Sequence, residues 1–379
     1  MTPYLDRRLP LPVRRQSFDW RSMNVTTLWI AAATVIVAVT ATRMLARWID
    51  RHDDLIMSLG SGAVFVFLFL LIASHLAVVV IHELGHILGG LAAGFRFQHV
   101  RISAMLFHRT KGVSFQRGAA FLVTGEAKMV PPPGEVAPSR YAVMVFAGPA
   151  ANLLSAALCM AHPSGLLLFI GLSLFLGIGD LFPFEMSLSV SDGGRLRMLF
   201  FDPPRRERWM AIVRLSAESS EGKQPDKMSP PLLAQATAIR DESHDTPTAH
   251  AFAYSAAMHR HEFDSAGDIL EVCLQYAAHT RPTVREALIS DAAIYQAAVR
   301  HDAALASAWL ADLPPHARPW LRVRVEAAIL EEQGQRDAAW RRLDEFERTL
   351  GGTPEQHLIA VTQKWKALLQ AQPVMPGTA

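Results

Sequence analysis

The sequence predicts a mainly α-helical protein in two parts. The first is a polytopic membrane helix bundle of about four spans with a small β insert, and the second is a soluble, all-α, helical-repeat-like domain. Half of the 379 residues are hydrophobic, and they concentrate before residue 186 in segments long enough to cross a bilayer. A stretch of short strand-like segments interrupts them, and the chain after residue 231 follows a helical pattern.

Composition argues against two classes of protein. The formal net charge is only +2, and no basic stripe is interleaved with aromatic residues, so nucleic acid is not an expected partner. The two cysteines, Cys159 and Cys273, lie in a predicted span and a predicted soluble helix. Because neither has a partner nearby in the sequence, we do not expect a disulfide framework.

Four apolar segments are candidates for membrane spans. We place them at about residues 26–46, 61–94, 141–161 and 165–184, within a membrane domain that covers residues 26–200 and follows a basic segment at 1–25. The first contains the uncharged stretch Asn24–Thr42. That stretch is longer than a usual signal-peptide core, so we interpret it as an anchor; a signal peptide cleaved near Ala41 is the alternative.

The arginines predict the orientation of the spans. Arginines cluster before the first span and after the fourth: Arg7, Arg8, Arg14, Arg15 and Arg21, and then Arg195, Arg197, Arg205, Arg206 and Arg208. The positive-inside rule places both clusters, and therefore the N- and C-termini, in the cytoplasm. We expect an integral multi-pass protein surrounded by membrane lipid, in the inner (cell) membrane of a bacterium.

The strongest chemical signal is an H-E-x-x-H motif formed by His82, Glu83 and His86. It follows directly on a stretch, Leu55–Ile81, that carries no charged side chain. Positions i and i+4 of a helix share a face, so both imidazoles can bind one metal ion, and Glu83 can deprotonate a water held by that ion. Each ionisable residue in lipid costs about 2.5–3.5 kcal/mol on the insertion scale. Because a purely structural helix gains little from three such residues, we predict one catalytic Zn²⁺ per chain.

A third protein ligand is required, because catalytic zinc sites usually take three ligands and a water. Asp192, which two glycines and Arg195 follow just after the fourth span, is our first candidate. A carboxylate beside glycines can approach a metal closely, although the same sequence is common in plain surface turns. Glu185 is the alternative third ligand, and Asp180 is a more distant one.

Three separated motifs in the region of about residues 60–200 resemble the site-2 protease family of intramembrane metalloproteases. They are the zinc motif at His82–His86, the segment Phe146–Asn152, which is similar to the family's F-A-G-P-x-x-N, and Asp192–Arg195, which is similar to its D-G-G-R element. The resemblance implies that His82, His86 and Asp192 bind zinc and that Glu83 is the catalytic base. It also implies that Gly148, Pro149 and Asn152 lie near substrate or support the ligands.

Three departures from the family pattern bear on Asp192. The family usually has N-x-x-P shortly before its D-G, whereas here Asp180 stands in place of the asparagine and the gap from Pro183 to Asp192 is long. Ser191 stands in place of the leucine that normally precedes the aspartate.

His75, two helical turns before His82, either supports the site or packs in the helix bundle.

Residues 95–130 predict a small β insert. Alternating segments at 97–101, 113–115 and 120–123 favour short strands, and Pro131–Gly134 ends the insert. Members of the family carry a small sheet beside the active site. An unpaired sheet edge could hold an unwound substrate backbone in extended form, which is the form that a protease can cut.

The rest of the chain predicts a linker at 201–231, a helical domain at 232–371 and a tail at 372–379. Phe263, His301 and Arg336 each start an Ala-bearing helix, 38 and 35 residues apart (263 to 301 and 301 to 336). These spacings resemble the tetratricopeptide period of about 34 residues, and a generic helical bundle is the alternative. A solenoid of this kind offers a concave docking surface for a protein partner.

These observations lead to one functional hypothesis and its alternatives. We predict an intramembrane zinc metalloendopeptidase that hydrolyses peptide bonds of a transmembrane protein or peptide substrate, as in regulated intramembrane proteolysis. The alternatives are a non-proteolytic membrane scaffold and a peptide-maturation or export subunit with a helical docking domain. The intact His82, Glu83 and His86 set favours the enzyme.

Overall fold

A computed structural model of the chain describes residues 2–12, 62–110, 112–115, 125–160, 166–186 and 189–350, with six single residues between 43 and 58. Nearly all of the first predicted span, the predicted strand at 120–123 and the chain beyond residue 350 lie outside these residues. The chain divides into two compact units. We call residues 17–206 the α3–α6 unit, and residues 1–16 with 207–379 the helical unit.

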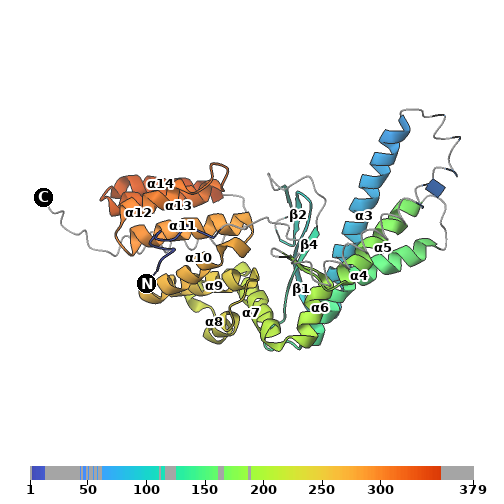
Figure 1. The fold of residues 1–379 in the computed structure, drawn as a ribbon, viewed down its shortest axis with the longest axis horizontal. Coiled ribbons are helices and arrows are strands. Elements are labelled where there is room, and N and C mark those ends of the chain that lie inside the picture. Colours follow the sequence, from blue (N-terminus) through green and yellow to red (C-terminus); the bar gives the residue numbers. More distant parts are fainter. Residues whose placement is uncertain are drawn as a thin grey trace. The chain divides into compact units, whose positions relative to one another are not determined.

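The α3–α6 unit combines apolar helices with a small antiparallel sheet, so the mainly helical class with a β insert is confirmed. Its elements are α3 (Gly62–Ala92), β1 (Arg96–Ile102), β2 (Met105–His108), β3 (Gly112–Phe115), β4 (Gly125–Val130), α4 (Pro138–Met160), α5 (Leu167–Leu181), β5 (Glu185–Met186), β6 (Ser189–Val190) and α6 (Asp192–Phe201). Helix α4 packs between α3 and α5, which also contact each other, and α6 packs against α4 (Figure 1).

Two helices in the described part of the chain are long and apolar enough to cross a bilayer, at Val64–Ala92 and Pro138–Met160. They fall at the second and third predicted spans. The third apolar helix, α5, has 15 residues and lies within the fourth predicted span. Many large apolar side chains on these helices are exposed: Val64, Phe65, Leu68, Phe69, Ile72, Leu84, Leu88, Val143, Phe146, Leu154, Leu158, Phe175 and Ile178. An apolar surface of this extent is unusual for a helix that faces water.

The four-stranded sheet lies beside the end of α3. Its strand order is β3-β2-β1-β4, with antiparallel neighbours throughout. Helix α3 contacts β1 and β4 (Figure 1), and a register shift interrupts the β1–β4 pairing between Phe97 and His99. The sheet therefore places an edge strand, β4, next to the helix that carries the H-E-x-x-H motif.

The helical unit consists of eight helices in its described part. They are α7 (Pro203–Ser220), α8 (Pro230–Thr237), α9 (Asp245–His259), α10 (Phe263–Gln275), α11 (Pro282–Ala298), α12 (Ala303–Ala311), α13 (Pro319–Glu332) and α14 (Arg336–Leu350), with short 3₁₀ turns η2 (Pro225–Lys227) and η3 (Ala277–His279). Neighbours in sequence pack together, as α9 does with α10, α11 with α12 and α13 with α14 (Figure 1). Prolines start α11 and α13 at their first turns, where a missing N–H costs no hydrogen bond.

The predicted linker at 201–231 is instead largely ordered structure that belongs to the helical unit's core. Helix α7 occupies most of it and buries Ile212 and Leu215, and Met228 packs into the same cluster as Leu232. The charged and proline residues of this stretch suggested a linker. The apolar positions between them form one buried stripe, and tertiary packing of that stripe stabilises the helix.

The N-terminal residues pack on the helical unit, although nearly 200 residues separate them from it in sequence. Leu5 is fully buried in the core cluster that α10 to α13 form. Tyr4 and Leu11 pack against the edge of the same cluster. The segment Thr2–Pro12, which the sequence marked only as basic and cytoplasmic, is therefore a bound part of this unit.

Candidate metal centre

Two helices bring three potential metal ligands together. His82 and His86 lie one turn apart on α3, and Asp192 is the first residue of α6. The Nε2 atoms of the two histidines are 3.0 Å apart. Asp192 Oδ2 lies 3.2 Å from His82 Nε2 and 3.3 Å from His86 Nε2. The three donor atoms are therefore close enough to bind one metal ion.

The spacing of the three donor atoms fits zinc. Zinc bound tetrahedrally at about 2.0–2.1 Å from nitrogen and oxygen ligands holds those ligands about 3.3 Å from one another. The observed triangle has sides of 3.0, 3.2 and 3.3 Å. Two imidazoles and one carboxylate also match the ligand types of catalytic zinc sites, which keep a fourth position for water.

His86 is held in the orientation that a metal ligand needs. Its Nδ1 lies 2.9 Å from the carbonyl oxygen of Met144, so Nδ1–H donates to that oxygen and the Nε2 lone pair faces the site. The ring lies directly against Gly148 of α4, where any Cβ would collide with the imidazole. Gly148, which the family resemblance singles out, therefore lets α4 approach the ligand. Pro149 is buried next to it, and its carbonyl faces α5.

His82 is oriented by Asn152, which is fully buried on α4. The side-chain amide of Asn152 lies 3.2 Å from His82 Nδ1, and its Oδ1 is buried without a hydrogen-bond partner. Rotating this amide by 180° lets Oδ1 accept from Nδ1–H and leaves the Nε2 lone pair for a metal. The carboxylate of Asp180 is 3.8 Å from the same nitrogen.

Glu83 is buried beside the ligands, with 6% of its surface exposed. It accepts a hydrogen bond from the backbone of Ala127 in β4, and its Oε2 is buried without a partner. Gly125 of β4 lies so close to this carboxylate that any side chain there would overlap it. A buried carboxylate oxygen with no protein partner is available to accept a hydrogen bond from a water or a substrate.

The start of α6 explains how a chain with an atypical motif still positions Asp192. Ser191 caps the helix: its hydroxyl accepts from the Gly194 amide at 3.0 Å and donates to the Phe182 carbonyl at 2.7 Å. The serine in place of the family's leucine is therefore an N-cap. The long gap before Asp192 is occupied by the paired strands β5 and β6.

The electrostatics at the start of α6 favour an ionised carboxylate. Burial alone would raise the pKa of the Asp192 carboxyl. In the protein without a metal, hydrogen bonds from the His82 and His86 imidazoles to this carboxylate nevertheless hold its pKa below the usual value. An ionised carboxylate is the form that binds a metal.

The other candidates lie in different positions. Glu185, the alternative third ligand, is on β5, where its carboxylate pairs with the guanidinium of Arg205. His75 is half-buried on α3, two turns before His82, and is not one of the three grouped donors.

Gly125, Ala127 and Met144 also contact the site, and we did not identify them from the sequence. The backbone groups that Ala127 and Met144 contribute exist in every residue, so no residue type marks them. Only Gly125 carries a signal, because a glycine at the start of a strand is typical of a close approach.

Comparisons with protein-family models, with curated proteins and with solved structures gave no match to this chain.

Proposed function

We propose that this protein is an intramembrane zinc metalloendopeptidase of the site-2 protease type. The observation that carries the proposal is the triangle of His82, His86 and Asp192 donor atoms, with sides of 3.0–3.3 Å, next to the buried carboxylate of Glu83. His82, Glu83 and His86 lie on the apolar helix α3, and Asp192 follows the apolar helix α5 after the short strands β5 and β6. A zinc-hydrolase centre on such helices acts on substrates in a membrane.

Each residue of the centre has a chemical role in peptide hydrolysis. A zinc ion bound by His82, His86 and Asp192 would supply a Lewis acid for the scissile carbonyl and lower the pKa of the attacking water. Glu83 accepts a proton from that water as the carbon–oxygen bond forms. It then returns the proton to the amide nitrogen as the carbon–nitrogen bond breaks. Asn152 and the Met144 carbonyl hold the two imidazoles in place.

The edge strand β4 provides a means of presenting the substrate. In the described residues, β4 pairs with β1 on one side and reaches Glu83 with the backbone of Ala127 on the other. An extended peptide that adds to this edge would pass the catalytic carboxylate with its backbone exposed. A transmembrane substrate has to unwind before cleavage, because its helix satisfies its own backbone groups.

The membrane setting extends this proposal. Helices α3 and α4 are long enough to span. The sequence predicts two further spans, one at 165–184, where α5 lies, and one at 26–46. Thr2–Pro12 packs on the helical unit, so both belong on one side of the membrane, as an even number of spans requires. The same contact favours an uncleaved anchor at 26–46. The arginine distribution makes that side the cytoplasm, in a bacterial inner membrane.

The helical unit supports the proposed repeat architecture. Phe263, Asp302 and Arg336 lie at the starts of α10, α12 and α14, so the recurring sequence marks every second helix. Pairs of helices at this period are the building unit of tetratricopeptide-like solenoids, which bind protein partners.

The test is zinc content together with cleavage of candidate single-span substrates by the purified full-length protein. Glu83→Gln keeps the three ligands but removes the base, so we expect one zinc per chain and a loss of cleavage of about 100-fold or more. Glu135→Gln, at an exposed glutamate outside the site, is the matched control and keeps full activity. Near-normal cleavage by Glu83→Gln removes Glu83 from the role of base. A wild-type protein that binds no zinc favours the scaffold alternative.

A further inference from the structure

The helical unit recognises the backbone of the N-terminal segment with side chains from three helices. Both carboxylate oxygens of Glu271, on α10, accept from the amides of Tyr4 and Leu5 at 2.9 and 2.8 Å. The carbonyl oxygen of Leu5 accepts from Gln296 Nε2 on α11 at 2.9 Å and from Trp309 Nε1 on α12 at 3.1 Å. Four hydrogen bonds therefore fix the main-chain groups around one residue of the segment.

These contacts are of the kind that bind a peptide. Backbone groups inside a helix are already paired, so a helical surface can hold an extended ligand's backbone only through side chains. Gln296 and Trp309 are almost completely buried under the segment. Hydrogen bonds to a peptide backbone provide affinity for many sequences, and the side-chain pockets provide the selection.

Two side chains of the segment enter sites that select for residue type. Leu5 is fully buried among apolar residues of the core cluster. Arg7, two residues later, donates to Asp312 Oδ2 at 2.7 Å and to the Ala308 carbonyl at 2.9 Å, and its guanidinium lies 5.1 Å from the ring centroid of Trp309. Arg7 adopts a φ of 55°, and its amide bonds the Tyr4 carbonyl at 3.0 Å. The bound segment is thus a turn with an aliphatic residue and an arginine on one face.

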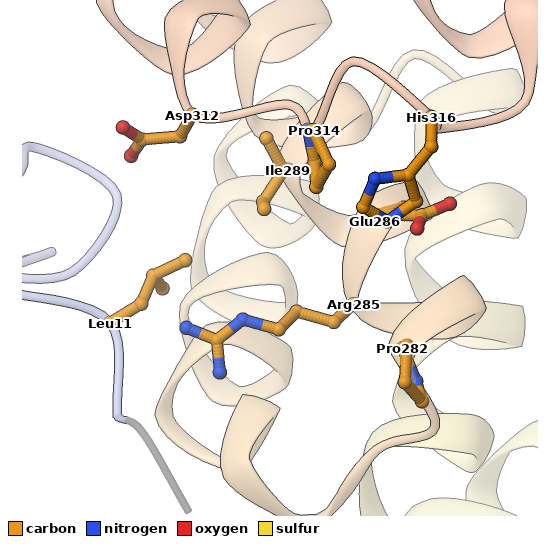
Figure 2. Close-up of a pocket in the computed structure, with 8 residues that line it drawn as sticks. All are labelled: Leu11, Pro282, Arg285, Glu286, Ile289, Asp312, Pro314 and His316. Carbon is orange, nitrogen blue, oxygen red and sulfur yellow. The ribbon is translucent and has the colours of Figure 1, made fainter.

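The rest of the segment fits its surroundings loosely. Leu9 is exposed, and the Arg8 side chain is 63% exposed. Beside Leu11 a cavity of about 390 Å³ remains open, lined by Arg285, Glu286, Asp312 and His316 among others (Figure 2). In Figure 2 the Arg285 side chain extends from its helix toward Leu11, and its guanidinium donates to the Pro12 carbonyl at 2.7 Å. The groove is therefore larger than the segment that occupies it.

We propose that Glu271, Gln296, Trp309 and Asp312 form a peptide-binding site of the helical unit and that Thr2–Pro12 is its built-in ligand. The partner is a protein that presents an aliphatic residue followed, two residues later, by an arginine. The partner's peptide displaces Thr2–Pro12 from the site and binds in its place. Because the segment is part of the same chain, it competes at a high local concentration, and the site opens only to a partner that binds more tightly or at high concentration.

Direct binding tests this exchange in the full-length protein, purified in detergent. The probe is a synthetic, fluorescently labelled copy of residues 2–12, and the readout is fluorescence anisotropy. A Leu5→Asp protein releases its own Thr2–Pro12 segment, because burying a carboxylate in the apolar Leu5 site is unfavourable. We expect the free peptide to bind this variant at least ten times more tightly than it binds the wild type.

Neighbouring arginines in the peptide provide a matched pair. Arg7→Asp in the probe removes the contacts to Asp312 and Trp309 and weakens binding more than tenfold. Arg8→Asp changes an exposed side chain and leaves binding within about threefold. Equal effects of the two changes overturn the proposed selection.

A second protein variant, changed at the surface, controls for unfolding of the core by Leu5→Asp. Arg7→Glu in the full-length chain loosens the segment without placing a charge in the Leu5 pocket, and it also binds the probe more tightly than the wild type. The proposal is overturned if neither variant binds the probe better than the wild type does. It is also overturned if both variants lose their cooperative thermal unfolding, since the segment is then a fixed part of the core. Zinc content and cleavage play no part in this readout, so its outcome is independent of the proposed protease.

Discussion

Two buried polar clusters in this protein differ in the kinds of groups that they bring together. In the helical unit, the fully buried Arg208 bonds Asp241 through both terminal nitrogens, at 2.9 and 3.0 Å, and also contacts Ser243 and Thr246. In the α3–α6 unit, by contrast, His82, His86 and Asp192 bring three atoms that can each bind a metal to within 3.3 Å of one another. An arginine that pairs with a carboxylate and two hydroxyls stabilises a fold. Three converging metal-binding atoms are the arrangement that the proposed zinc site requires.

The two clusters therefore predict opposite responses to mutation. Changes to the converging cluster should remove the proposed activity and leave stability nearly intact. Changes to the Arg208 network, which we define as Arg208, Asp241, Ser243 and Thr246, should lower stability and leave zinc content unchanged. The following variants test this contrast, from the largest expected effect to the smallest.

Asp192→Asn has the largest expected effect. It removes the only carboxylate of the donor triangle, so zinc content and cleavage both fall to background, while the thermal unfolding midpoint changes little. Glu185→Gln is the matched control: its carboxylate pairs with Arg205, so zinc content stays at one per chain. Metal analysis of both purified variants tests which carboxylate binds zinc. If Glu185→Gln loses zinc and Asp192→Asn keeps it, Glu185 and not Asp192 is the third ligand.

Arg208→Met affects stability. The side chain is fully buried and its removal leaves Asp241 and the buried Asp245 without their cation, which costs about 3 kcal/mol by analogy with other broken buried pairs. Thermal unfolding followed by circular dichroism should show a clearly lower midpoint for the helical unit. Zinc content per folded chain should be unchanged, and a parallel loss of zinc would contradict the separation of the two clusters.

Asn152→Ala affects the metal centre less than a ligand change does. It leaves the ligand set intact but frees the His82 ring, so zinc affinity should fall about tenfold to 100-fold, as is typical for groups that orient ligands. Titration with a competing chelator measures this loss. Asn152→Asp restores an acceptor for Nδ1–H and should recover most of the affinity, whereas equal losses in both variants would exclude the orienting role.

Acid should weaken the Arg208 network slightly. Partial burial alone would raise the pKa of Asp241, but hydrogen bonds from Arg208 and Ser243 hold it well below its usual range. A depressed pKa in the folded state contributes stability above the unfolded pKa of about 3.9, and this is lost as the pH falls below about 4. The effect is small because the carboxyl is about one-third exposed and screened by solvent. Unfolding midpoints of wild type and Asp241→Asn should converge as the pH is lowered from 7 to 3; a constant difference would rule out this linkage.

The most predictable elements were those with a long or periodic signal. The uncharged stretch before His82 predicts a helix, because twenty or more consecutive apolar residues are typical of a membrane-spanning helix. In the structure, α3 runs from Gly62 to Ala92. The strand-like alternation after Phe95 likewise predicts a small sheet, and the segments at 97–101 and 113–115 match β1 and β3, whereas β2 and β4 were not predicted. The region at 201–231 was misinterpreted, because its prolines and charges are local signals, and the burial of Leu215 and Met228 depends on partners elsewhere in the chain.

The sequence by itself determined the candidate residues: two histidines and a glutamate at helical spacing next to apolar sequence, and a carboxylate among glycines. Periodicity alone is enough to place His82 and His86 on one face. Only the tertiary structure shows which carboxylate lies beside the two histidines, that Asn152 and Gly148 contact the imidazoles, and that Thr2–Pro12 packs on the helical unit. These contacts join residues 62 to 305 positions apart, and no local pattern in a single sequence records which distant segments meet.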